Sequence, residues 1–130
     1  MQIKINVLTK IEDADKSTFY FIHNESKTVL PLEFNNLRDI STEDTYVRTL
    51  KALKVYIQSV NIYLYLEGIY YVYLKIPYNG NTFDINTSLS NALCILNYLP
   101  ETEVYIENEI LQQEGIKITK EMLEQSNLIG

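Results

Sequence analysis

The polar residues best placed for chemistry lie where a short strand gives way to a helix. Asn86, Ser88 and Asn91 fall at this junction, and Ser90 lies between the last two. Asp84 precedes Asn86 by two residues, on the same side of the strand. A helix that starts here exposes backbone N–H groups, which favour an anion such as a phosphate. A second interpretation stays open, in which Ser88 caps the helix and Asp84 is a solvated carboxylate.

Three cations precede this junction in the chain. Arg48, Lys51 and Lys54 follow one another at three-residue spacing. On a helix this spacing places them in one stripe that can contact phosphates. The same stripe is also typical of the solvent-facing side of an amphipathic helix, so its function stays open.

The reactive side chains that most often carry nucleophilic catalysis are scarce. His23 is the only histidine and is expected at a hairpin turn, and Cys94 is the only cysteine and lies among apolar residues. We expect His23 to be structural and Cys94 to be a small core residue. A single cysteine also excludes an internal disulfide and any multi-cysteine metal site.

Residues 76–116 contain no Lys or Arg but carry several carboxylates. These are Asp84, Glu101, Glu103, Glu107, Glu109 and Glu114. Such a region can bind a divalent cation or a basic partner protein, because both need convergent negative charge. A solvated acidic face that aids solubility is the alternative.

The composition indicates one folded domain over residues 1–130. The chain has 130 residues, 46% of them hydrophobic, and a formal net charge of −6. The negative charge opposes nonspecific binding of nucleic acid, although a local basic patch could still contact DNA or RNA. The single cysteine and the apparent lack of an N-terminal leader predict a cytoplasmic protein. Polar residues interrupt the most apolar stretch, Val55–Ile76, so we expect no contact with a membrane.

The first half of the chain predicts three strands and a helix. Residues 1–8 alternate apolar and polar side chains, and residues 18–23 and 27–34 read as a hairpin around Asn24–Ser26. Ser41 and Asp44 have the spacing of a capping box before a helix. The apolar stripe of that helix would be Tyr46, Leu50, Leu53 and Ile57.

The second half repeats this order of elements. Glu67-Gly68 and Asn79-Gly80 predict tight turns that join strands over residues 59–66, 69–76 and 82–86. A helix over residues 89–99 follows, then a short strand at 103–106, a helix that ends at a left-handed Gly115, and a last helix over 120–126. The sequence therefore predicts an α+β fold of duplicated β-β-β-α units, forming one largely antiparallel, barrel-like sheet with flanking helices.

The hairpin over residues 59–76 is rich in tyrosine and appears apolar on both faces. Strict alternation would place Val60, Ile62, Leu64, Leu66, Ile69, Tyr71 and Tyr73 on one face. The other face would carry Tyr63, Tyr65, Tyr70, Val72 and Leu74. Because two apolar faces must both be covered, we expect a homo-oligomer, with a dimer as the simplest form. Stacking of nucleic-acid bases on the tyrosines is a further alternative.

Two stretches of the sequence carry family-like motifs. Leu30, Pro31 and Leu32 match a Leu-Pro-Ile-type strand. Ile85, Ser90 and Ala92 match an Ile-Asp-x-Arg-Pro-Ser-Asp-Ala run that opens a helix, and residues 104–116 match the strand and helix that follow. In these motifs, and in element order over nearly the whole chain, the sequence resembles the bacterial bifunctional nuclease domain family, whose fold is two β3α2 repeats around one barrel-like sheet.

The resemblance implies hydrolysis of DNA or RNA phosphodiesters with a divalent metal, Mg²⁺ or Mn²⁺. It places Asn86, Ser90 and Asn91 at the catalytic site, with Asp84 or Glu107 as the carboxylate. Substrate contacts would come from Ser88, Arg48, Lys51 and Lys54. The family has aspartate where this chain has Asn86 and Asn91, and asparagine is neither a carboxylate base nor a strong Mg²⁺ ligand. A noncatalytic protein-interaction module on the same fold is therefore the alternative function.

Overall fold

The fold is α+β and is built on one eight-stranded sheet. The computed structural model describes residues 1–35, 48–119 and 121–122. Its strands are β1 (Gln2–Glu12), β2 (Lys16–His23), β3 (Thr28–Asn35), β4 (Ser59–Leu66), β5 (Ile69–Tyr78), β6 (Asn81–Thr87), β7 (Glu103–Glu107) and β8 (Ile116–Lys117). Its helices are α2 (Leu89–Tyr98) and α3 (Asn108–Glu114), and residues 48–52 are also helical.

The sheet is largely antiparallel and open. The strand order is β6-β5-β4-β7-β1-β2-β3-β8, and only β4 and β7 run parallel. Strands β6 and β8 are the two edges in the described part of the chain, so the predicted barrel does not close there. The predicted succession of β-β-β-α units is confirmed by the element order. Strand β8 was not predicted, because a strand of two residues has no recognisable pattern.

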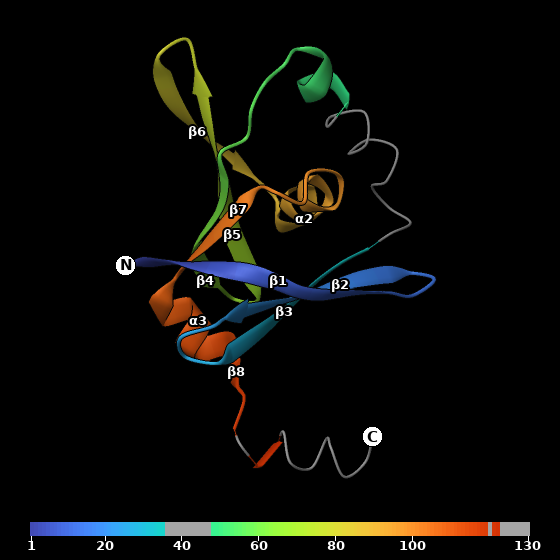
Figure 1. Ribbon diagram of the computed structural model, residues 1–130, viewed down its shortest axis with the longest axis vertical. Coiled ribbons are helices and arrows are strands. Elements are labelled where there is room, and N and C mark those ends of the chain that lie inside the picture. Colours follow the sequence, from blue (N-terminus) through green and yellow to red (C-terminus); the bar gives the residue numbers. More distant parts are fainter. Residues whose placement is uncertain (36–47, 120, 123–130) are drawn as a thin grey trace.

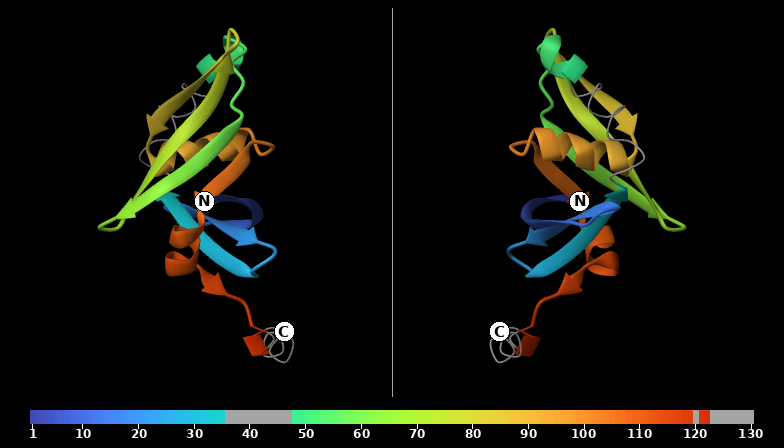
Figure 2. Two further views of the ribbon diagram at one scale, coloured as in Figure 1. Left: turned by 90° about the vertical axis from the view of Figure 1, so that its left-hand side faces the viewer. Right: turned by 90° about the vertical axis from the view of Figure 1, so that its right-hand side faces the viewer.

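The sheet bends where β1 passes from one neighbour to the other. Residues 2–5 of β1 pair with β7, and residues 6–12 pair with β2. As a result β1, β2 and β3 cross the direction of β4 to β7 steeply, and α2 lies in the angle between the two parts (Figure 1). The views in Figure 2 show the long β4–β5 hairpin reaching past α2, with α3 below the sheet.

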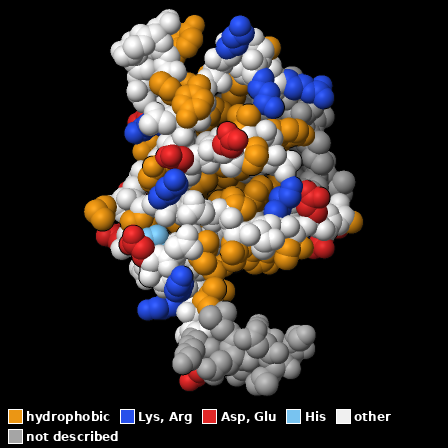
Figure 3. Space-filling model, viewed as in Figure 1, with side chains coloured by type: hydrophobic (Ala, Val, Ile, Leu, Met, Phe, Trp, Pro, Cys, Tyr) orange, Lys and Arg blue, Asp and Glu red, His pale blue; other side chains and the backbone are white. Residues whose placement is uncertain are grey.

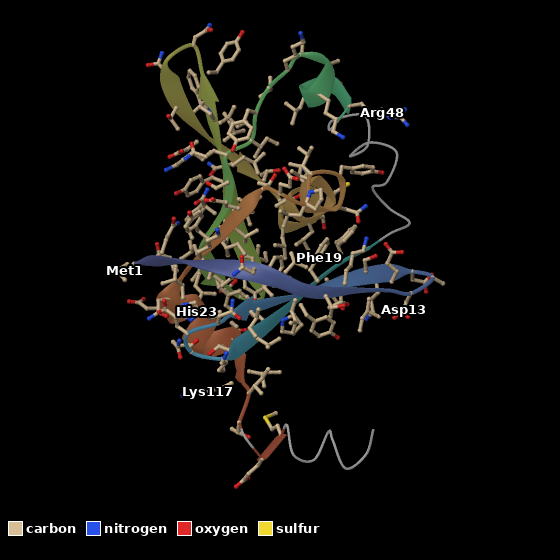
Figure 4. All side chains as sticks on the ribbon, in the orientation of Figure 1. Met1, Asp13, Phe19, His23, Arg48 and Lys117 are labelled. Carbon is tan, nitrogen blue, oxygen red and sulfur yellow. The ribbon has the colours of Figure 1, made fainter. Side chains whose placement is uncertain are left out.

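The core lies between α2 and the inner face of this bent sheet. The helix contributes Ala92 to Leu96, all of which are buried, so the expectation of a buried Cys94 is confirmed. Phe19 packs against Phe21 and Phe34 with ring centroids 5.9 and 6.0 Å apart and points toward α2 in Figure 4. Full burial of such side chains contributes about 1.5–3 kcal/mol each, which makes this layer the main source of stability.

The predicted tight turns are confirmed. Glu67 and Gly68 have φ values of 51° and 81°, and Asn79 and Gly80 have 50° and 79°. Two positive φ values in a two-residue loop are the mark of a type I′ turn, whose twist matches that of the strands it joins. The β4–β5 and β5–β6 turns therefore fix the pairing register of three consecutive strands.

The predicted faces of the β4–β5 hairpin are wrong beyond Ile62. Ile62 pairs with Val72 and Leu64 pairs with Tyr71, so Tyr63 is an extra residue that bulges out of the ladder. One extra residue shifts all that follows to the other face. The inner face therefore carries Val60, Ile62, Tyr65, Tyr70, Val72 and Leu74. The outer face carries Leu64, Leu66, Ile69, Tyr71 and Tyr73, of which the first four are exposed.

The helix before β4 ends earlier than its apolar pattern predicts. Leu53 and Ile57 were expected on the helical stripe, but the helical residues stop at 52. The N–H of Val55 donates to the carbonyl of Leu50, that of Lys54 donates to Lys51, and Lys54 has a φ of 57°. These are the two hydrogen bonds of a Schellman motif, which closes a helix. Lys54 therefore leaves the expected basic stripe.

The end of α3 is also different from the prediction. Gly115 was expected in the left-handed conformation, but its φ of −80° and ψ of 161° are extended. A Cβ atom built there would lie 2.5 Å from the carbonyl oxygen of Leu111 and 2.5 Å from Cγ2 of Thr28. Glycine is thus required for the close approach of α3 to β3 rather than for a special φ.

Two predicted helix segments fall outside the described residues. The capping box at Ser41 and Asp44 lies within residues 36–47, and most of the last predicted helix lies beyond residue 122. Within the described part of the chain, no helix has the length and apolar character needed to cross a membrane.

Candidate functional site

The strand-to-helix junction forms as predicted, and Ser88 acts as its cap. The Ser88 Oγ accepts a hydrogen bond from the backbone N–H of Asn91 at 3.0 Å, and the Ser88 carbonyl accepts one from Ala92. Asn86 lies at the end of β6, where its Oδ1 accepts a hydrogen bond from the Tyr63 hydroxyl at 3.4 Å. Ser88 therefore occupies one of the N–H groups that the helix start would otherwise offer to an anion.

The structure does not bring the predicted carboxylates together. Asp84 is exposed on the outer face of β6, opposite Lys75 of β5. Glu107 is on β7, which is three strands away in the sheet order, or about 14 Å at the usual strand spacing. It forms an ion pair of 2.9 Å with the Met1 amine. Among the described residues, no three His, Cys, Asp or Glu side chains lie close enough to hold a metal ion.

The other acidic residue on β7, Glu103, is engaged within the sheet. Glu103 accepts a hydrogen bond of 2.7 Å from the Tyr105 hydroxyl, and this contact raises the pKa of that tyrosine. Glu103 also lies 3.7 Å from the Lys4 ammonium group. The two carboxylates of β7 are thus partly neutralised by the Met1 amine and by Lys4 of β1.

The predicted basic residues lie at the other end of α2. Lys51 borders a hollow of about 400 Å³ together with Tyr98 and the residues that follow the helix. A ten-residue helix is about 15 Å long, so this hollow is far from Ser88 at the helix start. Figure 4 shows Arg48 at the outer end of the molecule, away from the sheet. The described geometry thus separates Lys51 from the predicted catalytic residues, whereas Ser88, the other kind of predicted substrate contact, lines the same hollow as Asn86.

The best-formed concave surface near Ser88 surrounds the end of the β4–β5 hairpin. Tyr70 borders two hollows there. The first, of about 420 Å³, is lined by Tyr63, Ile69, Tyr70, Tyr71, Val72, Asn86, Thr87 and Ser88. The second, of about 370 Å³, is lined by Thr18, Pro31, Leu32, Glu33, Gly68, Tyr70 and Leu89. We call the two hollows, with the hairpin residues 64–71 between them, the hairpin-tip surface.

The hairpin-tip surface is apolar and aromatic. Leu66 and Ile69 flank the turn and are 52% and 56% exposed, and both project from the outer face. The rings of Tyr65 and Tyr70 lie 4.5 Å apart on the inner side. Tyrosine is enriched in protein interfaces, since it buries a large area at little entropic cost, and an exposed aliphatic side chain beside it adds apolar area.

Carboxylates surround this surface. Glu67 is in the turn itself, and Glu33 borders the second hollow, where it forms an ion pair of 3.2 Å with Lys16. Glu114 at the end of α3 raises the pKa of Tyr65 by hydrogen bonding with it. Burial, together with the charge of Glu114, raises the pKa of Tyr70 to about 12. Since Lys16 neutralises Glu33, the negative charge that favours a cationic partner here comes from Glu67 and Glu114.

Sequence reasoning missed some of these residues. Leu89 and Glu33 had no signal, because their position depends on how β3 packs beside the hairpin end. From the sequence we expect His23 to be structural but name no partner for it; the His23 Nδ1 lies 2.7 Å from Ser26 Oγ, which in turn donates to Thr28 Oγ1 at 2.9 Å. The three-residue spacing of His23 and Ser26 across a tight turn was the available signal.

Comparison with known proteins adds no family to this geometry. No protein-family model matches the chain, and no curated protein matches it significantly. The functional argument therefore depends on the arrangement of the residues described above.

Proposed function

We propose that this chain is a noncatalytic protein-interaction module that binds a segment of a partner protein at the hairpin-tip surface. The observation that carries the proposal is the pair of hollows on either side of Tyr70, with exposed aliphatic side chains between them. Hollows next to exposed anchors are where binding energy concentrates in protein interfaces. A cytoplasmic location agrees with the single, buried Cys94.

The partner segment should carry Lys or Arg next to an aliphatic or aromatic side chain. The apolar side chain would enter a hollow beside Ile69, and the cation would lie near Glu67 in the adjoining turn. Rim charges of this kind mainly accelerate association and select the partner, and salt screens them. Binding should therefore weaken as ionic strength rises.

Phosphodiester hydrolysis, the activity that the family resemblance implies, stays a prediction. The observation in its favour is that Asn86 and Ser88 do line the same hollow. Such hydrolysis needs a group that activates water and a charge that stabilises the transition state, which carboxylate-held metals or paired cations usually supply. The described residues offer Asp84 and Lys75 on neighbouring strands but no metal-binding cluster.

Peptides selected from a random display library against the purified chain would test the interaction. We expect the selected peptides to be enriched in Lys and Arg beside an apolar residue. Ile69→Ser should weaken their binding by about tenfold or more in calorimetry, since it removes an exposed anchor. Leu53→Ser is the matched control, because Leu53 is 67% exposed and borders a different hollow beside Tyr78, at the other end of β5, and it should change affinity less than about twofold.

Two results would count against the interaction proposal. One is equal weakening by Ile69→Ser and Leu53→Ser, and the other is a set of peptides without cationic residues. Cleavage of DNA or RNA that needs Mg²⁺ or Mn²⁺, is abolished by EDTA and is lost in Asn86→Ala would instead support the nuclease hypothesis. The same protein preparation should be used for both assays.

A further inference from the structure

The two edges of the sheet are very different. The β8 edge is two residues long and ends in Lys117. The β6 edge is seven residues long, contains no proline and no cation, and pairs with β5 without a bulge. Proteins usually protect an exposed edge with short strands, lysine, proline or bulges, because its free backbone groups pair with other strands. Strand β6 carries one charged side chain, Asp84, and has none of the other protective features.

The backbone groups that face the open edge follow from the β5–β6 turn. Tyr78 pairs with Asn81 across the two-residue turn at Asn79-Gly80. The residues that flank such a turn form a hydrogen-bonded pair, and hydrogen-bonded pairs alternate along an antiparallel ladder. Every second residue from Asn81 therefore bonds to β5. The N–H and C=O groups of Thr82, Asp84 and Asn86 point to the open edge.

The side chains along this edge are also available for contact. Phe83 and Ile85 are 46% and 43% exposed on the inner face, where they border a hollow of about 310 Å³. Figure 3 shows hydrophobic side chains at the surface over the β5–β6 hairpin, at the upper left. On the outer face, Asp84 and Asn86 offer a carboxylate acceptor and an amide donor two residues apart.

We propose that two copies of this chain form a dimer by antiparallel pairing of their β6 edges, with Asp84 of each copy opposite Asn86 of the other. The two eight-stranded sheets would then join into one continuous sheet. Ile85 lies on the two-fold axis and faces its own copy. This inference rests on the β6 edge rather than on the hollows beside Tyr70, although Asn86 and Thr87 also line the first of those hollows.

This register is the one that suits both the backbone and the side chains. Only the outward-pointing Thr82, Asp84 and Asn86 can form hydrogen-bonded pairs across the edge. Pairing Asp84 with its own copy would oppose two negative charges, which is unfavourable. Pairing Thr82 with Asp84 would place the apolar Ile85 opposite Asn81. In the proposed register the carboxylate meets an amide twice, and the apolar Ile85 meets its own copy.

Analytical ultracentrifugation of charge variants tests the dimer. Asn86→Asp places two carboxylates opposite each other at both symmetric positions, so we expect the dimer dissociation constant to rise about tenfold or more. The double variant Asp84→Asn/Asn86→Asp exchanges the partners and should restore the constant to within about threefold of the wild type. A monomeric wild type, or a dimer that Asn86→Asp leaves unchanged, would overturn the proposal.

Cysteine crosslinking tests the register even if a charge variant folds poorly. In a Cys94→Ala background, Ile85→Cys should form a disulfide-linked dimer under mild oxidation, because the two copies of residue 85 face each other. Phe83→Cys is the matched control and should stay uncrosslinked, because it faces Thr87 of the other copy. Crosslinking through residue 83 in preference to residue 85 would show a different register and refute the proposed pairing.

Discussion

At the scale of single residues, Ser88 is the side chain whose contribution is easiest to measure. Its Oγ satisfies the N–H of Asn91 at the start of α2, which supplies much of the core. Ser88→Ala should lower the free energy of unfolding by about 0.5–2 kcal/mol in urea titrations, while Ser88→Asp should keep most of the stability. Ser90→Ala in the first turn is the control. Equal losses for the two alanine variants would show that capping is not the cause.

The ionisation of Tyr70 gives a second residue-scale prediction. Burial, aided by Glu114, raises its pKa from 10.0 to about 12. A raised pKa means that the folded state holds the proton more tightly than the unfolded state does. The contribution of Tyr70 to the free energy of unfolding is therefore fully present below pH 10, and it is lost as the pH rises toward 12. Residue-resolved NMR of ring-labelled tyrosine should show Tyr70 ionising late, and Glu114→Gln should move its pKa downward. A Tyr70 that ionises near pH 10 would contradict the described environment.

Local chemistry explains which of these residues were predictable. Ser88 was identified because a cap depends on the residues next to it in the chain. The role of Gly115 was misjudged because its close neighbour, Thr28, is on a distant strand. The hollows beside Tyr70 were not predictable for the same reason, since each joins residues from several separate segments. Long-range packing decides such contacts, and one sequence does not report it.

At the scale of elements, the bulge in β4 predicts an unusual tolerance. Because Tyr63 is the extra residue, its deletion leaves Ile62 facing inward and Leu64 facing outward, as before. The variant should therefore keep its circular dichroism and a cooperative urea transition. Deletion of Tyr73 from β5 is the matched control. This deletion should prevent folding. If Val72 stays in the core, Leu74 and Ile76, which are buried in the native sheet, then face outward.

Turns and bulges also mark what could be predicted about the elements. Glu67-Gly68 and Asn79-Gly80 were identified because a type I′ turn requires particular residues. A bulge has no such requirement when its residue is not glycine, so Tyr63 gave no signal and the faces beyond it were assigned in reverse. The early end of the helix at residue 52 was missed in the same way, because Lys54 replaces the glycine that usually adopts its positive φ.

At the scale of the whole molecule, the α+β order of strands and helices was predictable, because hydrophobic periodicity and turn residues report it directly. The arrangement of the strands was not. The sequence does not state that β7 inserts between β4 and β1, or that β4 and β7 run parallel. Paired residues of β4 and β7 are more than 40 positions apart in the chain, and those of β1 and β7 are about 100 positions apart. These pairings bring the two β-β-β-α units into one sheet.

The joint between the two units lies at Ile5, and it predicts how the molecule unfolds. Ile5 is buried and is the last residue of β1 that pairs with β7, and the next residue begins the pairing with β2. Both parts of the sheet therefore depend on this side chain. Ile5→Ala should cost about 2–5 kcal/mol and keep a single unfolding transition. Ile3→Ala, at a half-buried position on the same face, should cost less. Hydrogen exchange should show β2 and β5 losing protection together in Ile5→Ala, whereas separate loss would mean that the two units fold independently.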